Sequence, residues 1–237
     1  MKQSTVVAGS SLALVVALGL GFGIGRATVT APTTTTSTTT STTSPPSTSS
    51  TIPGNQPAEA AWPFAATANR FVNPVDAARS YATTFLRFTN PVIGTFQQGD
   101  TRSGEVVVSN HVGGTSTTIL VRQLSGDSSW WVLGSVAPDI HVTTPSALET
   151  ITSPISLSGT STAFEAVVNV ELYQDNSLIP IAATTVMGGS MGMMGPFSGS
   201  FSFPKPTEHS GTLVFRTYSA KDGGVIEASS LRVAFAP

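Results

Sequence analysis

The stretch SPISLSGTSTAFEAVVNVEL, residues 153–172, decides the fold of the C-terminal half of this chain of 237 residues. Beyond Phe164, apolar side chains at every second position fall on one face of a strand: Ala166, Val168, Val170 and Leu172. The opposite face carries a mixture of side chains: Glu165, Val167, Asn169, Glu171 and Tyr173. Because successive side chains of a β-strand point to opposite faces, this period of two predicts a long strand with one buried face.

The same period recurs along the rest of the C-terminal half. In FSGSFSF, residues 197–203, phenylalanines face one way and serines the other, and Leu231, Val233 and Phe235 repeat the pattern. Asp222-Gly223 lies between two such runs and predicts a hairpin turn, since glycine accepts a positive φ. APDIHVTTP, residues 137–145, supplies the first strand. Six or seven short strands in about one hundred residues predict a β-sandwich over residues 138–237.

Three stretches together resemble a known domain: ITSPISLSGTSTAFEAVVNVELYQ from residue 151, GPFSGSFSF from residue 195 and GTLVFRTYSAKDGGVIEASSLRVAF from residue 211. Over about residues 138–237 they are similar to the immunoglobulin-like domain of bacterial sporulation and spore-germination proteins. The shared marks are the Ser-Pro step, the small-Gly turn, the Phe-Glu pair, the glycine-phenylalanine strand and the late Ser-x-Lys-Asp-Gly hairpin. The resemblance implies an immunoglobulin-like sandwich outside a bacterial membrane, and no catalysis. The GerMN domain that usually accompanies this family is not visible upstream.

The resemblance also implies a role for the Phe-Glu pair. Phe164 would plug the core where the chain turns into the long strand. Glu165 would lie on the outer face and hold a nearby turn or an arginine such as Arg216 or Arg232. Neither catalysis nor metal binding is expected of Glu165.

Residues 62–137 contain one strong helix signal. Asn73 suits the N-cap, Pro74 the first helical position, and Asp76 the first turn, where a carboxylate meets the positive end of the helix dipole. Apolar residues recur at helical spacing until Asn90-Pro91 ends the helix: Val75, Ala78, Ala82, Phe85 and Leu86. The period then changes to two, with turn clusters near residues 110 and 125. These patterns predict a small α+β domain, in which one helix lies on an antiparallel meander.

The N-terminal end, residues 1–26, is one compositional unit. Residues 6–24 carry no charge, and 19 residues give a helix of about 28 Å, close to the bilayer core thickness of about 30 Å. They predict a retained single-pass anchor in a bacterial plasma membrane, with a cleaved signal peptide as the alternative. Gly19 and Gly23, then Gly21 and Gly25, form overlapping G-x-x-x-G pairs, so a homodimer through this helix is a further alternative.

Residues 27–61 contain neither lysine nor arginine, and their centre is a run of Thr, Ser and Pro. This run, residues 33–51, has no apolar residues to bury, and the segment is expected to stay extended and disordered, as a stalk. At about 3.1 Å per residue, the 35 residues reach on the order of 100 Å. A tether of this kind favours an extracytoplasmic location for the domains that follow.

Composition excludes several classes of function. The chain has no cysteine, a net charge of −2 and scattered Lys and Arg, so we expect no disulfides, no thiolate metal site and no nucleic-acid binding. His111, His141 and His209 lie too far apart in the sequence for a zinc motif, so no metal or cofactor is expected. Trp130 and Trp131 are expected to divide, with one in the core and the other on the outer face.

Residues 186–196, VMGGSMGMMGP, hold every methionine except the initiator. Four glycines are expected to prevent a regular element, so this segment is predicted to be a flexible loop between two strands. Methionine is unbranched and polarizable, which suits an adaptable contact surface. Met191, Met193 and Met194 are therefore the candidate partner-contact residues. A loop folded onto its own domain and a Cu(I) site are the alternatives.

Together these observations predict a membrane-tethered, extracytoplasmic, non-enzymatic two-domain protein of a bacterial envelope. The stalk sets the reach, and the two domains bind an envelope protein or a cell-wall polymer. One alternative is a hydrolase with a site assembled from scattered residues, which a polar pocket gathering His111, His141 and Asp139 would favour. The other alternative is a structural surface spacer without a specific binding surface.

Overall fold

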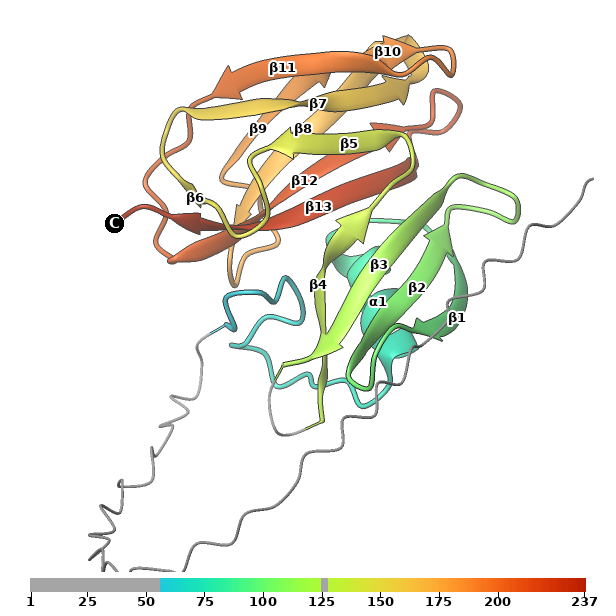
Figure 1. The fold of residues 1–237 in the computed structure, drawn as a ribbon, viewed down its shortest axis with the longest axis vertical. Helices are drawn as coiled ribbons and strands as arrows, with labels where there is room; N and C mark the ends of the chain where they lie inside the picture. The colour runs from blue at the N-terminus through green and yellow to red at the C-terminus, as the bar shows by residue number, and fades with distance from the viewer. Residues whose placement is uncertain (1–55, 125–127) are drawn as a thin grey trace, which may run out of the picture. The chain divides into compact units, whose positions relative to one another are not determined.

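The computed structural model describes residues 56–124 and 128–237 (Figure 1). The predicted membrane segment, residues 6–24, and the predicted stalk as far as residue 55 lie outside these described residues. The prediction of a disordered stalk is wrong for residues 56–61, because Ala60 and Ala61 are buried against the folded part of the chain. Within residues 56–124 and 128–237, no helix is both long enough and apolar enough to cross a membrane. The described chain is mainly β, with one short helix near its start.

The helix α1, Pro74–Ser80, begins as the sequence predicts. The Asn73 side chain accepts a hydrogen bond of 2.8 Å from the backbone N–H two residues on, which satisfies one of the unpaired donors at the helix start. A π-helical turn, Tyr81–Phe85, continues the helix. The predicted end at Asn90 is wrong, because Arg87 has a φ of 65°, in the left-handed region, and turns the chain away earlier.

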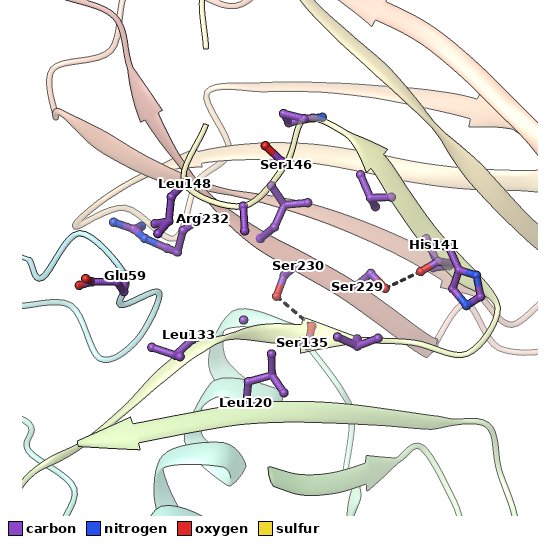
Figure 2. Close-up of a pocket in the computed structure, with 17 residues that line it drawn as sticks. Glu59, Leu120, Leu133, Ser135, His141, Ser146, Leu148, Ser229, Ser230 and Arg232 are labelled. Carbon is purple, nitrogen blue, oxygen red and sulfur yellow. Dashed lines mark hydrogen bonds between the residues drawn. The ribbon is translucent and has the colours of Figure 1, made fainter. Parts of the chain in front are cut away.

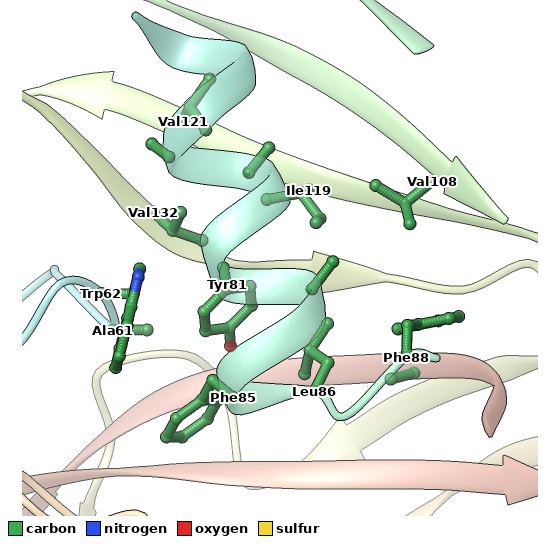
Figure 3. Close-up of a cluster of buried hydrophobic side chains, with 14 of the residues drawn as sticks. Ala61, Trp62, Tyr81, Phe85, Leu86, Phe88, Val108, Ile119, Val121 and Val132 are labelled. Atoms are coloured by element: carbon green, nitrogen blue, oxygen red, sulfur yellow. The ribbon is translucent and has the colours of Figure 1, made fainter. Parts of the chain in front are cut away.

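Four antiparallel strands follow as a meander with neighbours in chain order, as predicted: β1 Val92–Gln98, β2 Ser103–Ser109, β3 Ser116–Gln123 and β4 Trp130–Val136. One face of the meander buries side chains at alternate positions: Val106, Val108, Ile119 and Val121. The helical segment lies against this face (Figure 3), and Tyr81, Phe85 and Leu86 complete the buried cluster. In β2 and β3 the period of two therefore identified the face that the helix covers.

The C-terminal half adds nine strands in two sheets (Figure 1): β5 Ile140–Thr144, β6 Thr150–Ile151, β7 Ile155–Ala163, β8 Val167–Gln174, β9 Ala182–Met187, β10 Gly189–Ser190, β11 Gly195–Phe201, β12 Ser210–Tyr218 and β13 Val225–Phe235. β13, β12, β8 and β9 continue the sheet of the meander in that order. β5, β7 and β11 form the second sheet, with β10 beside β7 and β6 beside β13. A 3-10 turn, Phe164–Ala166, joins β7 to β8. The predicted β-sandwich is confirmed.

The sandwich core contains the side chains that the alternating pattern placed there. Val168, Val170 and Leu172 of β8 are buried in one cluster with Phe197 of β11. The ring of Phe197 lies 6.0 Å, centroid to centroid, from the ring of Phe215 on the opposite sheet. The β12–β13 hairpin also turns where predicted, since Gly223 has a φ of 71°.

The meander and the sandwich share buried surface. Tyr173, Val214, Val225 and Ala228, from β8, β12 and β13, belong to the same cluster as the helix. The rings of Phe85 and Tyr173 are 4.9 Å apart, and the Tyr81 hydroxyl is 2.8 Å from the Ser230 hydroxyl. β4 pairs with β13 at Ser135 and Ser230, so one nine-stranded sheet runs through both halves. The predicted division into residues 62–137 and 138–237 stays a prediction about independent folding.

Two buried arginines tie the outer face of the sandwich to the N-terminal half. Arg216 on β12 bonds the Glu171 carboxylate through Nη1 and donates from Nη2 to the Phe85 carbonyl oxygen at 2.8 Å. Arg232 on β13 makes a bidentate pair with Asp175, with Nη–Oδ distances of 2.5 and 2.9 Å. Its Nε donates to the Ala58 carbonyl oxygen at 3.2 Å, which fixes the first part of the described chain to the last strand.

Candidate functional site

Four connections gather at one end of the sandwich, which we call the loop end. They are residues 137–139 before β5, residues 164–166 between β7 and β8, residues 188–194 around β10, and residues 219–224 between β12 and β13. The strand register places them together, since Ser161 near the end of β7 pairs with the starts of both β5 and β11. The Gly188 N–H also donates to the Ala166 carbonyl oxygen at 3.0 Å.

The methionine segment contains a tight turn. Met191 and Gly192 have φ values of 53° and 78°, and the Met193 N–H donates to the Ser190 carbonyl oxygen at 2.9 Å. Two central residues with positive φ are the signature of a type I′ turn. A Cβ on Gly189 would lie 1.9 Å from the Met193 carbonyl oxygen, so this glycine permits close backbone contact. The expectation that the glycines prevent a regular element is wrong, because Gly189–Ser190 forms β10 beside β7 and Gly195 begins β11.

The three candidate contact residues all lie at the surface of this turn. Met191 is 95% exposed, Met193 73% and Met194 43%. Methionine side chains of this size are usually buried in monomeric proteins, so a group of exposed ones indicates a contact surface. Their role in binding a partner stays a prediction.

The expected role of Phe164 is wrong. Phe164 is 64% exposed and does not plug the core. Glu165 and Ala166 have φ values of 55° and 62°, and these two left-handed residues turn the Phe164 side chain outward. Ala163 packs against the sandwich core in its place. Phe164 is therefore a second exposed apolar side chain at the loop end, in addition to Met191. We call these two side chains the apolar tips.

The expected arginine partner of Glu165 is also wrong. Arg216 pairs with Glu171, and Arg232 pairs with Asp175. Glu165 is exposed on the turn that carries Phe164. The sequence held one usable signal for the true pairing, since Glu171 shares its strand face with the buried Tyr173.

A cavity of about 620 Å³ lies beside the two apolar tips. Its wall is formed by Thr115, Asp139, Thr162, Ala163, Phe164, Glu165, Ser190, Met191, Gly192, Thr217, Ile226 and Glu227. The charged residues of this wall are three acids: Asp139, Glu165 and Glu227. The cavity therefore combines apolar rims with a negatively charged interior.

Glu227 is the residue of this cavity that sequence reasoning missed. Glu227 is only 2% exposed. One carboxylate oxygen accepts from the Thr217 hydroxyl at 3.3 Å, and the other accepts from the Asp139 N–H at 3.3 Å. Burial, followed by the nearby charge of Asp139, raises the pKa of Glu227 from 4.5 to about 7. The strand pattern alone gave no signal, because Glu227 occupies an ordinary position in β13.

A second cavity, of about 550 Å³, lies between β4, β5 and β13 (Figure 2). Leu120, Leu133 and Leu148 form part of its mainly apolar wall. Its serines already bond within the protein: Ser135 lies 2.8 Å from Ser230, and Ser229 donates to the Ile140 carbonyl oxygen at 2.8 Å. It offers a ligand fewer free polar groups than the acidic cavity.

The residues named for a scattered hydrolase site lie apart. Asp139 lines the acidic cavity, His141 lines the second cavity, and His111 lines a third. Among residues 56–124 and 128–237, no cluster of three His, Cys, Asp or Glu side chains has the geometry to hold a metal ion. The structure therefore does not gather the polar pocket that would have favoured this alternative.

The tryptophan pair divides between two faces as expected, since Trp130 belongs to the buried cluster with the helix and Trp131 to neither core cluster, but the outer tryptophan is not exposed. Trp130 is 8% exposed and Trp131 is 4% exposed, so both are buried. The segment before α1 pairs with the edge of β4 through bridges that join Trp62 to Val132 and Phe71 to Trp130. Arg70, on the same segment, lies over the Trp131 ring at 5.1 Å. Strand alternation could not show that a distant segment would cover the second face.

Comparison with known proteins identifies part of the chain. Residues 139–224 match the family model described as the immunoglobulin-like domain of bacterial spore germination. No curated protein and no solved structure gives a significant match to the chain. The match covers β5 to the β12–β13 hairpin, which includes the whole loop end apart from residues 137 and 138. The match therefore confirms, over residues 139–224, the resemblance to this family that was read from the sequence.

Proposed function

We propose that the protein is a membrane-tethered, extracytoplasmic binding module of a bacterial envelope, and that its loop end contacts a partner protein. The family of residues 139–224 supports a binding or structural role. The uncharged residues 6–24, followed by the Thr/Ser/Pro-rich segment, support the tether. The proposal includes no catalytic step, in keeping with the family resemblance.

The observation that carries this proposal is the exposure of the Met191 and Phe164 side chains at the loop end. Both side chains are largely exposed, and both stand on turns that contain non-glycine residues with positive φ. Such residues cost about 1–3 kcal/mol each and persist only where the surrounding structure holds them. The turns therefore hold the backbone that carries these apolar side chains in a defined conformation, which lowers the backbone entropy lost on binding.

A protein partner fits this surface better than a cell-wall polymer. Thioether and phenyl groups gain most by burial against apolar side chains. A glycan offers mainly hydroxyl and amide groups, which need hydrogen-bonding partners. The exposed tips supply none of these, so we assign the loop end to a protein.

Replacing Met191, Met193 and Met194 together by serine is expected to weaken retention of the full chain on envelope material by at least about tenfold, because contact residues of an interface carry most of its binding energy. The melting temperature should stay nearly unchanged, since these side chains are exposed. Co-sedimentation of the purified chain with envelope membranes measures retention.

The matched control replaces Leu178 and Ile179 by serine. These are exposed apolar residues, 45% and 76%, in the turn between β8 and β9 at the opposite end of the sandwich. The control should bind like the wild type. Equal loss in both variants would indicate non-specific adhesion, and unaltered retention in both would favour the structural spacer.

The tether makes a separate prediction about topology. Protease added to intact cells should release a soluble fragment that contains residues 56–237, by cutting between residues 27 and 55. Immunoblotting of the medium and the cell pellet measures the release. If the segment is cut only after lysis, the domains are cytoplasmic and the proposal is wrong.

A further inference from the structure

The acidic cavity contains a buried carboxylate without a cation. Glu227 is 2% exposed, and none of the ion pairs among residues 56–124 and 128–237 includes it. The two hydrogen bonds that it accepts are both long, at 3.3 Å. Because a buried charge is usually stabilised by an opposite charge, the charged form of Glu227 lacks the cation that would stabilise it.

The other charged groups of the cavity increase the need for a cation beside Glu227. Asp139 enters from the connection before β5, and Glu165 enters from the turn between β7 and β8. Because like charges repel, the Asp139 carboxylate raises the pKa of Glu227 further and makes its charged form less favourable. A cation inside the cavity would relieve both the repulsion and the burial of Glu227.

Thr162 provides an independent sign of a missing ligand. This residue lines the cavity and is only 9% exposed. Its Oγ1 is buried and has no hydrogen-bond partner among the described residues. An unpaired buried hydroxyl typically costs about 1–3 kcal/mol, and such groups are rare in native proteins. A polar ligand in the cavity would satisfy it.

We propose that the acidic cavity binds a lysine side chain of the partner protein, with its ammonium between Glu227, Asp139 and the Thr162 hydroxyl. This inference rests on the proposed function and names the chemistry of the partner. Ala163, Phe164, Met191 and Ile226 supply the apolar wall for the methylene stem of the lysine. The exposed tips then contact the residues that flank it.

An ammonium suits the cavity better than a guanidinium or a metal ion. The acids enter from three different elements, and an ammonium donates in three directions, whereas the donors of a guanidinium lie in one plane. The described residues also hold no cluster with the geometry of a metal site.

The titration of Glu227 gives the inference a pH signature. Asp139 and Glu165 share its cavity, Thr217 faces it from β12, and Lys221 and Asp222 line a neighbouring cavity. Since the pKa of Glu227 is about 7, the free cavity loses this charge in mild acid, while the lysine keeps its own. Binding should therefore weaken as the pH falls from 8 to 5.5.

The test uses the full chain, purified in mild detergent, and envelope membranes. Glu227→Gln should reduce retention at pH 8 by at least about tenfold, because a hydrogen-bonded charge pair is lost. The wild type should lose retention to a similar extent at pH 5.5, and Glu227→Gln should be insensitive to pH. Asp139→Asn is the second variant, and Glu105→Gln, an exposed acid on β2, is the control.

Carbodiimide treatment at pH 7 then identifies the group in the cavity, since it joins a carboxylate to an amine in contact through an amide bond. Mass spectrometry should find Glu227 or Asp139 joined to a lysine of a protein, and this product should be absent when the joined acid is replaced. A product with an amine of a wall peptide would overturn the inference. The inference would also be overturned if Glu227→Gln kept wild-type retention while the triple methionine variant lost retention. In that case the proposed function would still hold.

Discussion

Replacing Asp175 by asparagine is expected to lower the free energy of unfolding by about 3–5 kcal/mol. Asparagine keeps the shape of the side chain and one acceptor oxygen, but it removes the charge opposite Arg232. The Arg232 side chain is 2% exposed, and a guanidinium stays protonated at any ordinary pH. The variant therefore leaves an uncompensated charge inside the protein.

Urea denaturation of the full chain in detergent measures this effect. Glu105→Gln is the control, and removal of this exposed acid should change the free energy by less than about 0.5 kcal/mol. The double variant Asp175→Leu with Arg232→Met should recover most of the loss, because removing both charges leaves neither unpaired. A loss below about 1 kcal/mol in Asp175→Asn would mean that Thr212 and the Ala58 carbonyl suffice to stabilise Arg232.

Replacing Glu227 by glutamine should have the opposite sign and depend on pH. In the unfolded chain this carboxyl loses its proton near pH 4.5, whereas the folded chain retains it up to about pH 7. Folding therefore takes up a proton between these values, and stability falls as the pH rises, by about 3 kcal/mol in total. Glutamine removes this slope, so the variant should be more stable than the wild type at pH 8 and similar to it near pH 4.5.

The measurement is the difference in unfolding free energy between variant and wild type at several pH values. Glu165→Gln is the matched control, because this acid lines the same cavity but is exposed. Its curve should run parallel to that of the wild type. A Glu227→Gln curve that is also parallel would show that the wild-type carboxyl ionises normally and would contradict the assignment.

These two variants also separate structural acids from binding acids. Loss of Asp175 should destabilise the protein, whereas loss of Glu227 should stabilise it and weaken retention. A group that lowers stability yet aids binding is the usual behaviour of a functional site. The position of Glu227 beside the loop end agrees with that expectation.

Local signals in the sequence predicted much of the fold. Asn73 and Pro74 marked the helix start because capping depends on adjacent residues. The Asp222-Gly223 hairpin likewise depends on one dipeptide, and the strand faces depend on a period of two. The family resemblance over residues 139–224 extended these signals to a complete sandwich.

The errors concern side chains whose environment comes from distant parts of the chain. Phe164 was assigned to the core, but two consecutive left-handed residues after it reverse its direction. Trp131 is buried although it faces away from the helix, because Arg70 of the segment before α1 lies over its ring. Arg216 was paired with the wrong acid, since several acids share suitable strand faces and only the register selects Glu171. Periodicity identifies a face, and it does not identify what covers that face.

The surface shared by the meander and the sandwich has an evolutionary consequence. A domain that is shuffled between genes must keep its fold when its neighbour is lost. If residues 139–224 were transferred alone, Tyr173 and Val214, which are at most 1% exposed, would face solvent. The transferred piece would also lack β13, the strand that lies between β12 and β4. Recombination that preserves solubility should therefore exchange the meander and the sandwich as one heritable unit.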